Sequence, residues 1–370
     1  MTRRRPLLAL LLAGVTALSA AVVSAPSAPA AGADTPPLAW SLLATGSAER
    51  FRGLSAVDDQ VAWVSGTNGT VLRTIDGGVT WASVGPRLAG ANAAFQFRDV
   101  EAFSATTAVI LSIGTGTDSR IYRTQDGGAT WSLSFVNHEA TAFYDCLAFT
   151  TPNRGVASSD PVDGRFRLVE TVDGGRTWTR VATVGMPPAL DGEAGFAASG
   201  TCLSAGQGQR VYLATGGAMA RARVLRSDDG GRVWQAADTT VRGAPTAGVF
   251  SVQFRDARHG IAVGGNFRKP EVTAHAASWS DDGGATWQQP TTATGGYRSG
   301  SSWVPGAGAE ALAVGPTGSD VTTDGGRTWQ TFDTGSFDSV QCTSGSVCWA
   351  SGELGRVARL TVPAAVSARR

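Results

Sequence analysis

The sequence predicts an all-β fold, a seven-bladed β-propeller of four-stranded blades closed by an N-terminal strand that completes the last blade. The first indication is composition: 48 Gly, 16 Pro and 11 Trp in 370 residues, with only 16% charged, are typical of short strands joined by tight turns. The second is a motif, Asp-Gly-Gly-x-x-Trp, that occurs six times. Successive motifs are 50, 47, 56, 53 and 42 residues apart, which is the length of one propeller blade with its loops.

Each repeat has the same internal order of strands. An aromatic-led strand comes first, as in FRGLSAV from Phe51, and a small apolar strand follows, as in VAWVSG from Val61. A third strand leads into the motif, and the motif Trp opens the fourth. The seventh unit starts at Phe337 and has no motif, whereas the segment around Trp40 matches a fourth strand. We therefore expect the N-terminal segment to complete the seventh blade and to leave no open blade at the seam.

The motif itself is interpreted as a structural turn. A hairpin between the third and fourth strands needs positive φ, which Gly77 and Gly78 supply freely. The Asp carboxylate can accept hydrogen bonds from the turn's own backbone, and the Trp ring packs beside the neighbouring blade. A calcium loop would need alternating oxygen ligands and a distal Glu, which the motif lacks, so no metal is predicted. The six structural aspartates are Asp76, Asp126, Asp173, Asp229, Asp282 and Asp324.

The N-terminus has the features of an export signal. Residues 1–30 contain a basic start, TRRRP, an apolar run and small residues before Ala30. We expect this segment to be a cleaved signal peptide, residues 31–362 to form the propeller and residues 363–370 to be a flexible tail. The protein would then be exported, either secreted or in the cell envelope, and would associate with a membrane only if the signal stayed uncleaved.

The four cysteines predict two disulfides, because an even count is typical of exported chains. Cys342 and Cys348 flank five residues, so a bridge across one hairpin is an attractive pairing, and it would leave Cys146 with Cys202. Three pairings exist in principle, and reduced buried cysteines are the alternative. A zinc site is disfavoured because neither a CxxC pair nor clustered His accompanies them. No cofactor is predicted.

The motif, written S/T-x-D-x-G-x-T-W, resembles the BNR/Asp-box repeat and matches nearly the whole mature chain. Sialidases and sortilin-type receptors carry this repeat, but its presence in almost every blade is most similar to the photosystem II stability/assembly factor-like family, as an exported bacterial member. The resemblance implies a seven-bladed propeller that acts as a non-enzymatic assembly chaperone. We therefore expect a monomeric scaffold that binds a protein or peptide partner, or else a glycan, on the loop face.

The net charge of +1 gives no strong positive field, which argues against a nucleic-acid partner. Binding sites commonly use loops held on a rigid scaffold. The loops opposite the motif turns contain these candidate ligand-binding residues: Asp160, Asp163, Arg165, Glu193 and Asn266.

A second group of candidates comes from the first strand of each unit. Aligning the leading aromatics places Arg52, Arg98 and Arg298 in the next position, with Tyr144 and Asp338 in the same position of two other blades. The blade order would bring the three Arg together at one mouth of the central channel, where they would suit a carboxylate or phosphate. The alternative is that each Arg stem covers apolar strand surface while its head stays in water.

A glycoside hydrolase of sialidase-like type, acting at the central pocket, is the alternative function. It would need an Arg triad, a Tyr nucleophile assisted by Glu, and an acid. Arg52, Arg98 and Arg298 could supply the triad, and the other roles would fall to Tyr144 or Tyr297, Glu193 and Asp160. FRGL lacks the Ile-Pro that follows Phe-Arg in sialidases, so we assign no catalytic residue and favour the non-enzymatic scaffold.

Overall fold

The computed structural model describes residues 1–2 and 38–362, except 89, 91–93, 219 and 346. The predicted signal peptide, 1–30, apart from residues 1–2, and the predicted tail, 363–370, lie outside the described residues. The chain divides into two units, Met1–Asp34 and Thr35–Arg370, and every strand belongs to the second unit.

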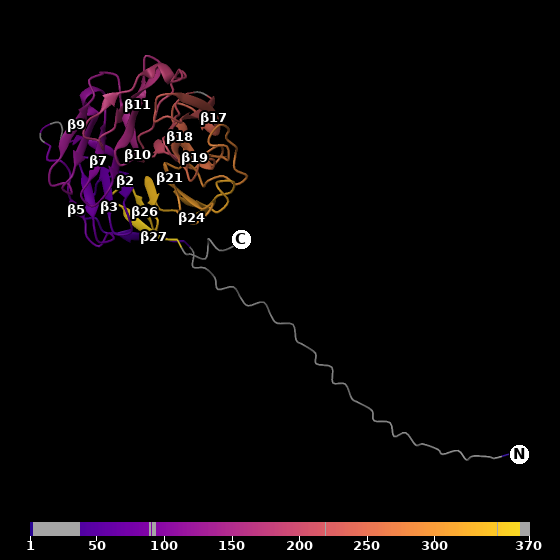
Figure 1. The fold of residues 1–370 in the computed structure, drawn as a ribbon. Coiled ribbons are helices and arrows are strands. Elements are labelled where there is room, and N and C mark those ends of the chain that lie inside the picture. Colours follow the sequence, from indigo (N-terminus) through magenta and orange to yellow (C-terminus); the bar gives the residue numbers. More distant parts are fainter. Residues whose placement is uncertain (3–37, 89, 91–93, 219, 346, 363–370) are drawn as a thin grey trace. The chain divides into compact units, whose positions relative to one another are not determined.

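Seven antiparallel sheets form a ring around a central axis, which confirms the predicted propeller (Figure 1). In Figure 1 the first strands of the blades, such as β2, β10 and β18, lie near the middle, and last strands such as β5, β9 and β24 lie at the rim. The blades, in order, are β2 (Phe51–Ala56), β3 (Ala62–Gly66), β4 (Val71–Thr74) and β5 (Ala82–Ser83); β6 (Gln96–Ala102), β7 (Ala108–Ile113), β8 (Arg120–Thr124) and β9 (Ser132–Val136); β10 (Tyr144–Thr151), β11 (Arg154–Val162), β12 (Arg165–Thr171) and β13 (Thr179–Arg180); β14 (Leu203–Ala205), β15 (Val211–Ala214), β16 (Ala220–Ser227) and β17 (Trp234–Gly243); β18 (Ala247–Phe254), β19 (Gly260–Asn266) and β20 (Ala277–Ser280); β21 (Gly300–Trp303), β22 (Ala311–Gly315), β23 (Gly318–Thr322) and β24 (Gln330–Asp333); and β25 (Ser339–Cys342), β26 (Val347–Ser351), β27 (Val357–Thr361) and β1 (Ser41–Leu43).

Blade 5 has three strands, and its fourth position holds a single bridge between Trp279 and Gln288. The 3-10 turns η2 (Gly116–Asp118) and η3 (Thr183–Gly185) lie in connecting loops. Over the described residues, no helix is long and apolar enough to cross a bilayer.

The ring closes where the sequence predicted. Strand β1 pairs antiparallel with β27, with Ser41 opposite Arg359 and Leu43 opposite Val357. Just before β1, the Trp40 ring packs 5.3 Å from that of Phe337, and its Nε1 donates a hydrogen bond of 2.9 Å to Ser319 Oγ. The pairing with β27 and the contact with Phe337 hold this segment to the last blade, which therefore has its four strands, and the bond to Ser319 ties it to blade 6.

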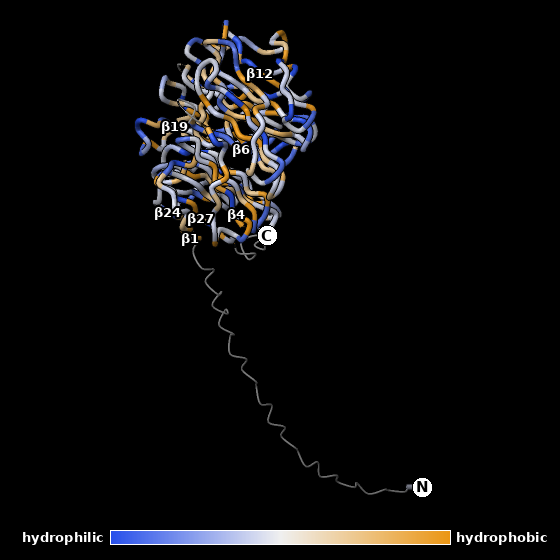
Figure 2. The backbone as a smooth tube through the Cα atoms, turned by 90° about the vertical axis from the view of Figure 1, so that its left-hand side faces the viewer, coloured by the Kyte–Doolittle hydropathy of each residue, from blue (hydrophilic) through white to orange (hydrophobic). Residues whose placement is uncertain are grey.

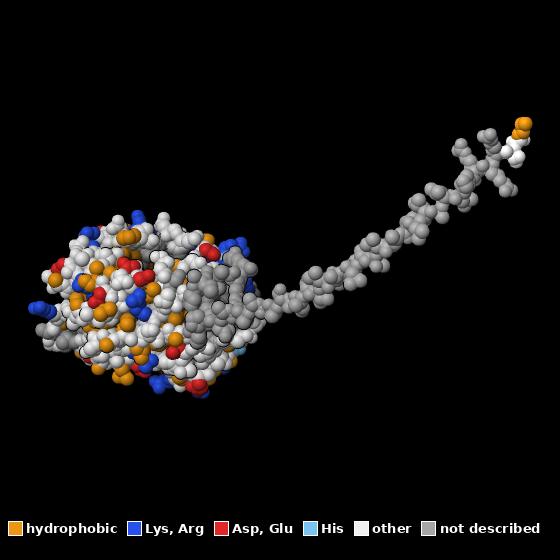
Figure 3. Space-filling view, turned by 90° about the horizontal axis from the view of Figure 1, so that it is seen from below, with side chains coloured by type: hydrophobic (Ala, Val, Ile, Leu, Met, Phe, Trp, Pro, Cys, Tyr) orange, Lys and Arg blue, Asp and Glu red, His pale blue; other side chains and the backbone are white. Residues whose placement is uncertain are grey.

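The core lies between neighbouring blades. Second strands such as β3, β22 and β26 are buried at every residue, which explains why their sequences are largely apolar. Trp81 meets Trp349 of the adjacent blade edge to face, with ring centroids 6.2 Å apart. Figure 2 shows apolar and hydrophilic stretches interspersed along the chain. On the side seen in Figure 3, charged and apolar side chains are interspersed.

Each Asp-Gly-Gly turn is held by its own Asp. In blade 1, Asp76 Oδ1 accepts hydrogen bonds from Thr74 Oγ1 (2.8 Å) and Thr80 N (2.9 Å), and Oδ2 accepts one from Thr80 Oγ1 (2.6 Å). Gly77 and Gly78 have φ of 73° and 88°, which a side chain would strain. Hydrogen bonds from the Oγ and backbone N of Thr80 lower the pKa of Asp76 to about 2. The backbone N–H contact to Oδ1 recurs at Asp126, Asp173, Asp229, Asp282 and Asp324.

The four cysteines form two disulfides, as predicted, and the pairing is the one favoured for the hairpin. Cys342 and Cys348 lie directly opposite each other on β25 and β26, with Cα atoms 3.9 Å apart. Cys146 on β10 is bonded to Cys202, just before β14, so this disulfide joins blades 3 and 4 near the central channel.

Candidate functional site

The central channel has two ends, which we name by their surroundings. The turn end is the side of the Asp-Gly-Gly turns; the loop end is the opposite side, where the inner strands begin. The loop end contains a cavity of about 630 Å³. Its charged lining residues are Arg50, Arg52, Arg98, Asp145, Asp160, Asp338 and Glu353, and its aromatic ones are Phe143, Phe196, Phe250, Phe267 and Tyr297.

A β-bulge near the start of the inner strand aims several of these side chains at the cavity. Pairing skips one residue between Phe51 and Gly53 in β2, and the same irregularity recurs in β6, β10 and β18. A bulge adds a residue that has no partner and re-aims its side chain. The four skipped residues, Arg52, Arg98, Asp145 and Phe250, all line the cavity.

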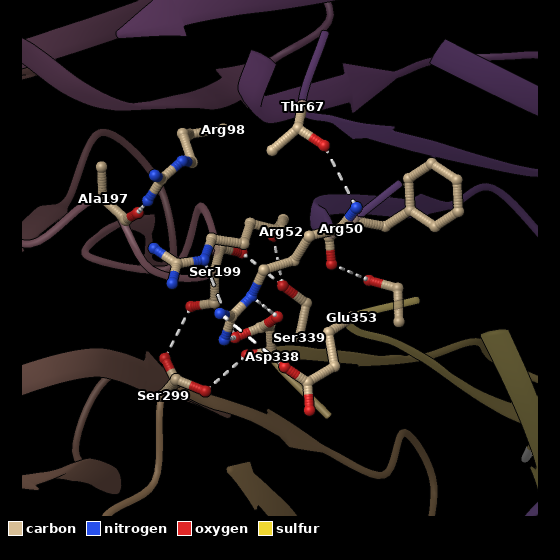
Figure 4. Close-up of polar contacts among 12 residues, drawn as sticks. Arg50, Arg52, Thr67, Arg98, Ala197, Ser199, Ser299, Asp338, Ser339 and Glu353 are labelled. Carbon is tan, nitrogen blue, oxygen red and sulfur yellow. Dashed lines mark hydrogen bonds and ion pairs between the residues drawn. The ribbon is translucent and has the colours of Figure 1, made fainter. Parts of the chain in front are cut away.

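One guanidinium in the cavity has its own carboxylate. Arg50 Nε and Nη2 each donate a hydrogen bond of 2.7 Å to Asp338, one to each oxygen (Figure 4). Glu353 lies 3.9 Å from Arg50 Nη1. Arg52 Nε is 3.8 Å from Asp338 Oδ1, beyond hydrogen-bond distance. Asp338 therefore pairs principally with Arg50.

Within the described part of the chain, Arg52 and Arg98 have no carboxylate of comparable closeness. Arg52 Nε is buried without a hydrogen-bond partner there, and burial lowers the pKa of Arg52. Arg98 donates to neutral acceptors, Gln96 Oε1 at 2.7 Å and Ala197 O at 2.9 Å. Burial and then the adjacent Arg52 lower the pKa of Arg98 to about 10, so both groups stay charged at neutral pH. A desolvated cation without a counter-charge is unfavourable unless an anion arrives.

Two carboxyl groups lie on another wall of the cavity. Asp160 Oδ1 accepts a hydrogen bond of 2.8 Å from Gly195 N, whereas Asp145 Oδ2 is buried without a partner among the described residues. Burial raises the pKa of both groups, and the charge of neighbouring Asp160 raises that of Asp145 further. The pair therefore retains a proton at a pH where isolated carboxyls would have lost it.

An aromatic wall adjoins the charged groups. Phe196 and Phe250 are stacked with centroids 4.2 Å apart and planes 6° apart. Tyr297 meets Phe250 edge to face at 4.7 Å, and Phe267, which is 42% exposed, approaches the same ring at 6.2 Å. The cavity thus offers a flat apolar surface beside the guanidiniums of Arg52 and Arg98.

Residues 196–201, which lead into blade 4, reach across the channel and form the floor of the cavity. Ser199 Oγ donates to Ser299 O of blade 6 at 2.7 Å, and Ser339 Oγ of blade 7 donates to Ser199 O at 3.1 Å (Figure 4). Gly200 has φ of +76°, and a Cβ there would lie 2.4 Å from Asp99 Oδ1 of blade 2. The crossing therefore requires glycine.

Of the candidate residues predicted from sequence, Arg52, Arg98 and Asp160 lie in this cavity, as do Tyr297 and Asp338, which were named beside them. Arg298 does not join them. Strand register aligns Arg298 with Phe51, because Gly300 pairs with Val314 as Gly53 pairs with Ser65. Its side chain therefore points between the blades, is 0% exposed and pairs with Asp320 at 2.6 Å.

Tyr144 has a similar position, since it aligns with Phe97 and packs edge to face with Phe135 at 5.2 Å. The expected meeting of Arg298 with Arg52 and Arg98 thus does not occur. Aligning the leading aromatics placed blades 3 and 6 one residue out of register.

The other loop candidates are engaged in local structure and do not line the cavity. Glu193 accepts hydrogen bonds from Arg223 Nε (2.9 Å), Thr215 Oγ1 (2.6 Å) and Leu190 N (2.8 Å). The remaining contacts are Asp163 with Arg167 at 3.0 Å, Arg165 Nη1 with Met186 O, and Asn266 Oδ1 with Thr246 Oγ1 at 3.0 Å.

Sequence reasoning missed Arg50, Asp145 and most of the aromatic wall. Asp145 occupies the bulge position in FYDC, a position that the register reveals and that no residue-type pattern marks. Arg50 precedes the first paired residue of β2, and Phe196 lies in the segment that crosses the channel. A bulge-aware alignment of the inner strands would have found Asp145 and Phe250.

The comparisons with known proteins concern the fold of the chain. No family model and no curated protein matches the sequence. The solved structure described as YCF48 bound to D1 peptide is similar with a TM-score of 0.59 at 16% identity, covering 91% of this chain and 100% of that one. YCF48 from Cyanidioschyzon merolae has a TM-score of 0.61 at 16% identity, covering 87% and 98%.

The WD40 β-propeller domain of Doa1 is similar as well, with a TM-score of 0.55 at 12% identity, covering 90% of this chain and 99% of that domain. Likeness at such low identity extends across propellers of different kinds. What this chain shares with them is the β-propeller fold.

Proposed function

We propose that this chain is an exported, non-enzymatic scaffold that binds a protein or peptide partner at the loop-end cavity. The observation that supports this most directly is the pair Arg52 and Arg98, two largely buried guanidiniums for which the described residues supply no carboxylate at hydrogen-bond distance. A peptide carboxylate, from an acidic side chain or a C-terminus, would supply the missing charge. A neighbouring apolar side chain of the peptide would pack on Phe250 and Phe267.

The comparisons agree with a peptide ligand. YCF48, which shares the fold, has been solved with a D1 peptide bound. The resemblance of the six Asp-Gly-Gly motifs to the Asp-box repeats of assembly-factor-like propellers supports the same class of function. An identity of 16% does not name the partner of this chain, so the partner has to be identified by experiments on this chain.

Export and a monomeric state complete the proposal. The signal-like residues 1–30 and the two disulfides support an oxidising location, in the medium or the cell envelope. The ring closes with strands of a single chain, which supports a monomer.

The contacts favour binding over glycoside hydrolysis. Two residues that the sialidase-like alternative would use, Tyr144 and Arg298, are 1% and 0% exposed between blades. Glu193 is held by Arg223 and Thr215. An incubation with a fluorogenic sialoside tests this directly: we expect no turnover, and turnover that Arg52→Ala abolishes would establish the hydrolase.

The binding test uses a library of peptides with free and amidated C-termini and with acidic or neutral sequences. Selected peptides are titrated against wild type, the double variant Arg52→Ala/Arg98→Ala and the control Arg242→Ala, which removes an exposed Arg outside the cavity. Hydrogen bonds to charged groups contribute about 1.5–3 kcal/mol each, so we expect the double variant to lose roughly tenfold or more in affinity. Equal affinity of the double variant would refute the proposed site.

A further inference from the structure

The turn end of the channel contains a second cavity, of about 270 Å³. Its lining among the described residues is distinct from that of the loop-end cavity. Ser199, Gly200 and Thr201, in the segment that crosses the channel, line it on one side. Its remaining lining residues are Leu54, 99–101, 147–149, 203–205, 253, 254, 301–303 and 339–342, which lie on the inner strands of all seven blades.

The charge of this cavity is opposite to that of the loop end. Its described lining includes Asp99 and Glu101 but no Arg, Lys or His. Asp99 Oδ2 accepts a hydrogen bond of 2.7 Å from Leu147 N. Burial raises the pKa of Glu101 to about 7, and burial and then the nearby Glu101 raise that of Asp99. These shifts are those of carboxyl groups in a low-dielectric space that lacks a cation.

At the position equivalent to Glu101, here called its level, the side chains of three other blades accept a hydrogen bond from a backbone N–H of the next blade. Ser55 Oγ accepts from Ala102 N at 2.9 Å, and Ser302 Oγ accepts from Cys342 N at 3.0 Å. Gln341 Oε1 accepts from Ala56 N at 2.8 Å in the same way. These contacts account for the polar groups of three blades at this level.

Three polar side chains at the same level, those of Ser204, Glu101 and Gln253, make no such contact among the described residues. Ser204 on β14 is 5% exposed, and its Oγ is buried without a hydrogen-bond partner among the described residues. The Glu101 carboxylate, which is partly exposed and lines the cavity, has no side-chain hydrogen bond to any residue in the described part of the chain. Buried polar groups are nearly always paired, so the unpaired Ser204 hydroxyl, in a cavity that the Glu101 carboxylate also lines, indicates a missing partner.

We infer that the turn-end cavity binds a singly charged cationic group with N–H donors, an ammonium or a guanidinium. Glu101 would supply the counter-charge, and Ser204 Oγ would accept one of the N–H donors. The group could belong to a free small molecule or to a basic side chain of a partner, since both present the same chemistry. The volume is below that of a typical drug-sized pocket, roughly 300–1,000 Å³, which suits a compact group.

A divalent metal fits less well. Within the described residues, no cluster of three or more His, Cys, Asp or Glu is placed to hold a metal ion. Two carboxyls, one of which already accepts a backbone hydrogen bond, match a single positive charge better than a double one.

The test measures binding of butylammonium, N-acetylarginine amide and, as neutral counterparts, butanol and N-acetylcitrulline amide by calorimetry at pH 8. Wild type is compared with Glu101→Gln, Ser204→Ala and the loop-end variant Arg52→Ala. We expect saturable binding of at least one cation, no binding of its neutral counterpart, about tenfold or greater weakening in Glu101→Gln, and unchanged affinity in Arg52→Ala. A preference for butylammonium would indicate a small amine, and a preference for the arginine derivative a basic side chain.

The inference is overturned if neither cation binds, if Glu101→Gln binds as wild type does, or if calcium binds in a Glu101-dependent way while the organic cations do not. Wild-type binding measured at pH 5.5 keeps the test decisive even if a variant fails to fold. We expect it to weaken at pH 5.5, where Glu101 is protonated, and affinity independent of pH would contradict the site. Since Arg52→Ala serves as the control, failure here is distinguishable from failure of the loop-end proposal.

Discussion

Arg50 and Asp338, 288 positions apart in the chain, form a two-pronged ion pair across the seam where blade 7 meets blade 1, with both N–O distances at 2.7 Å. This ion pair occupies both oxygens of the Asp338 carboxylate at the mouth of the channel. Asp338 therefore pairs with Arg50, whereas Arg52, 3.8 Å from the same carboxylate, interacts with it more weakly.

The first prediction concerns that competition. Asp338→Asn removes the negative charge that lies nearest to both Arg50 and Arg52, so the mouth becomes more positive. We expect an acidic peptide that binds wild type to bind Asp338→Asn more tightly, although the variant loses about 1–2 kcal/mol of stability because Arg50 is partly exposed. Arg50→Ala should act in the opposite sense, because Asp338 can then pair with Arg52. Titration of both variants checks this, and a shift in the same direction for both would contradict it.

The second prediction concerns Arg298. Its guanidinium and the Asp320 carboxylate are both 0% exposed and 2.6 Å apart. Breaking such a pair from one side leaves a buried charge, so Arg298→Ala should lower the free energy of unfolding by about 3–5 kcal/mol. Arg52→Ala, whose side chain is 23% exposed, should cost much less. Urea unfolding of the two variants distinguishes the roles, and equal losses would show that Arg298 is not a structural residue.

These two arginines show how far sequence reasoning reaches. The seven units and the N-terminal closing strand were predictable because a repeated motif fixes the period, and Trp40 matched the one strand type that the seventh unit lacked. The direction of an inner-strand side chain was not predictable, because one bulged residue moves the next side chain to another face. Arg52 and Arg298 follow an aromatic residue alike, yet one lines the cavity and the other is buried between blades.

The floor of the cavity was also beyond sequence reasoning. Residues 196–201 look like the start of another inner strand, but β14 begins only at Leu203. The preceding residues instead bond to blades 2, 6 and 7 through Ala197 and Ser199. Such contacts depend on where three distant blades meet, which no local pattern encodes.

The third prediction concerns the disulfides. Cys146–Cys202 spans 56 positions and Cys342–Cys348 only 6. In the chain-entropy model a longer closed loop constrains the unfolded state more, by about 4 kcal/mol for the first and about 2 kcal/mol for the second. We expect Cys146→Ala/Cys202→Ala to lower stability more than Cys342→Ala/Cys348→Ala, as judged by denaturant unfolding under oxidising conditions. The reverse order would show that local packing outweighs loop closure.

The last prediction is a stability maximum at mildly acidic pH. Hydrogen bonds from the Thr at the end of the turn lower the pKa of Asp76 and Asp126 to about 2, and in the remaining motif aspartates hydrogen bonds outweigh burial to lower it as well. A carboxyl whose folded pKa lies below its unfolded value, about 3.9, stabilises the fold above that value, and the contribution is lost as pH falls through the folded pKa. Stability should therefore decline below about pH 4.

The channel carboxyls act in the opposite sense. Burial raises the pKa of Asp99, Asp145, Asp160 and Glu101, with Glu101 at about 7. Above the unfolded pKa the folded state then binds more protons than the unfolded state, so stability falls as pH rises toward and through the folded values. Denaturant unfolding at pH 3, 5 and 8 should give the largest free energy near pH 5. Asp145→Asn should flatten the decline from pH 5 to 8, whereas Asp238→Asn, an exposed control, should leave it unchanged; stability that rises steadily from pH 5 to 8 would show that these carboxyls are ionised in the folded protein.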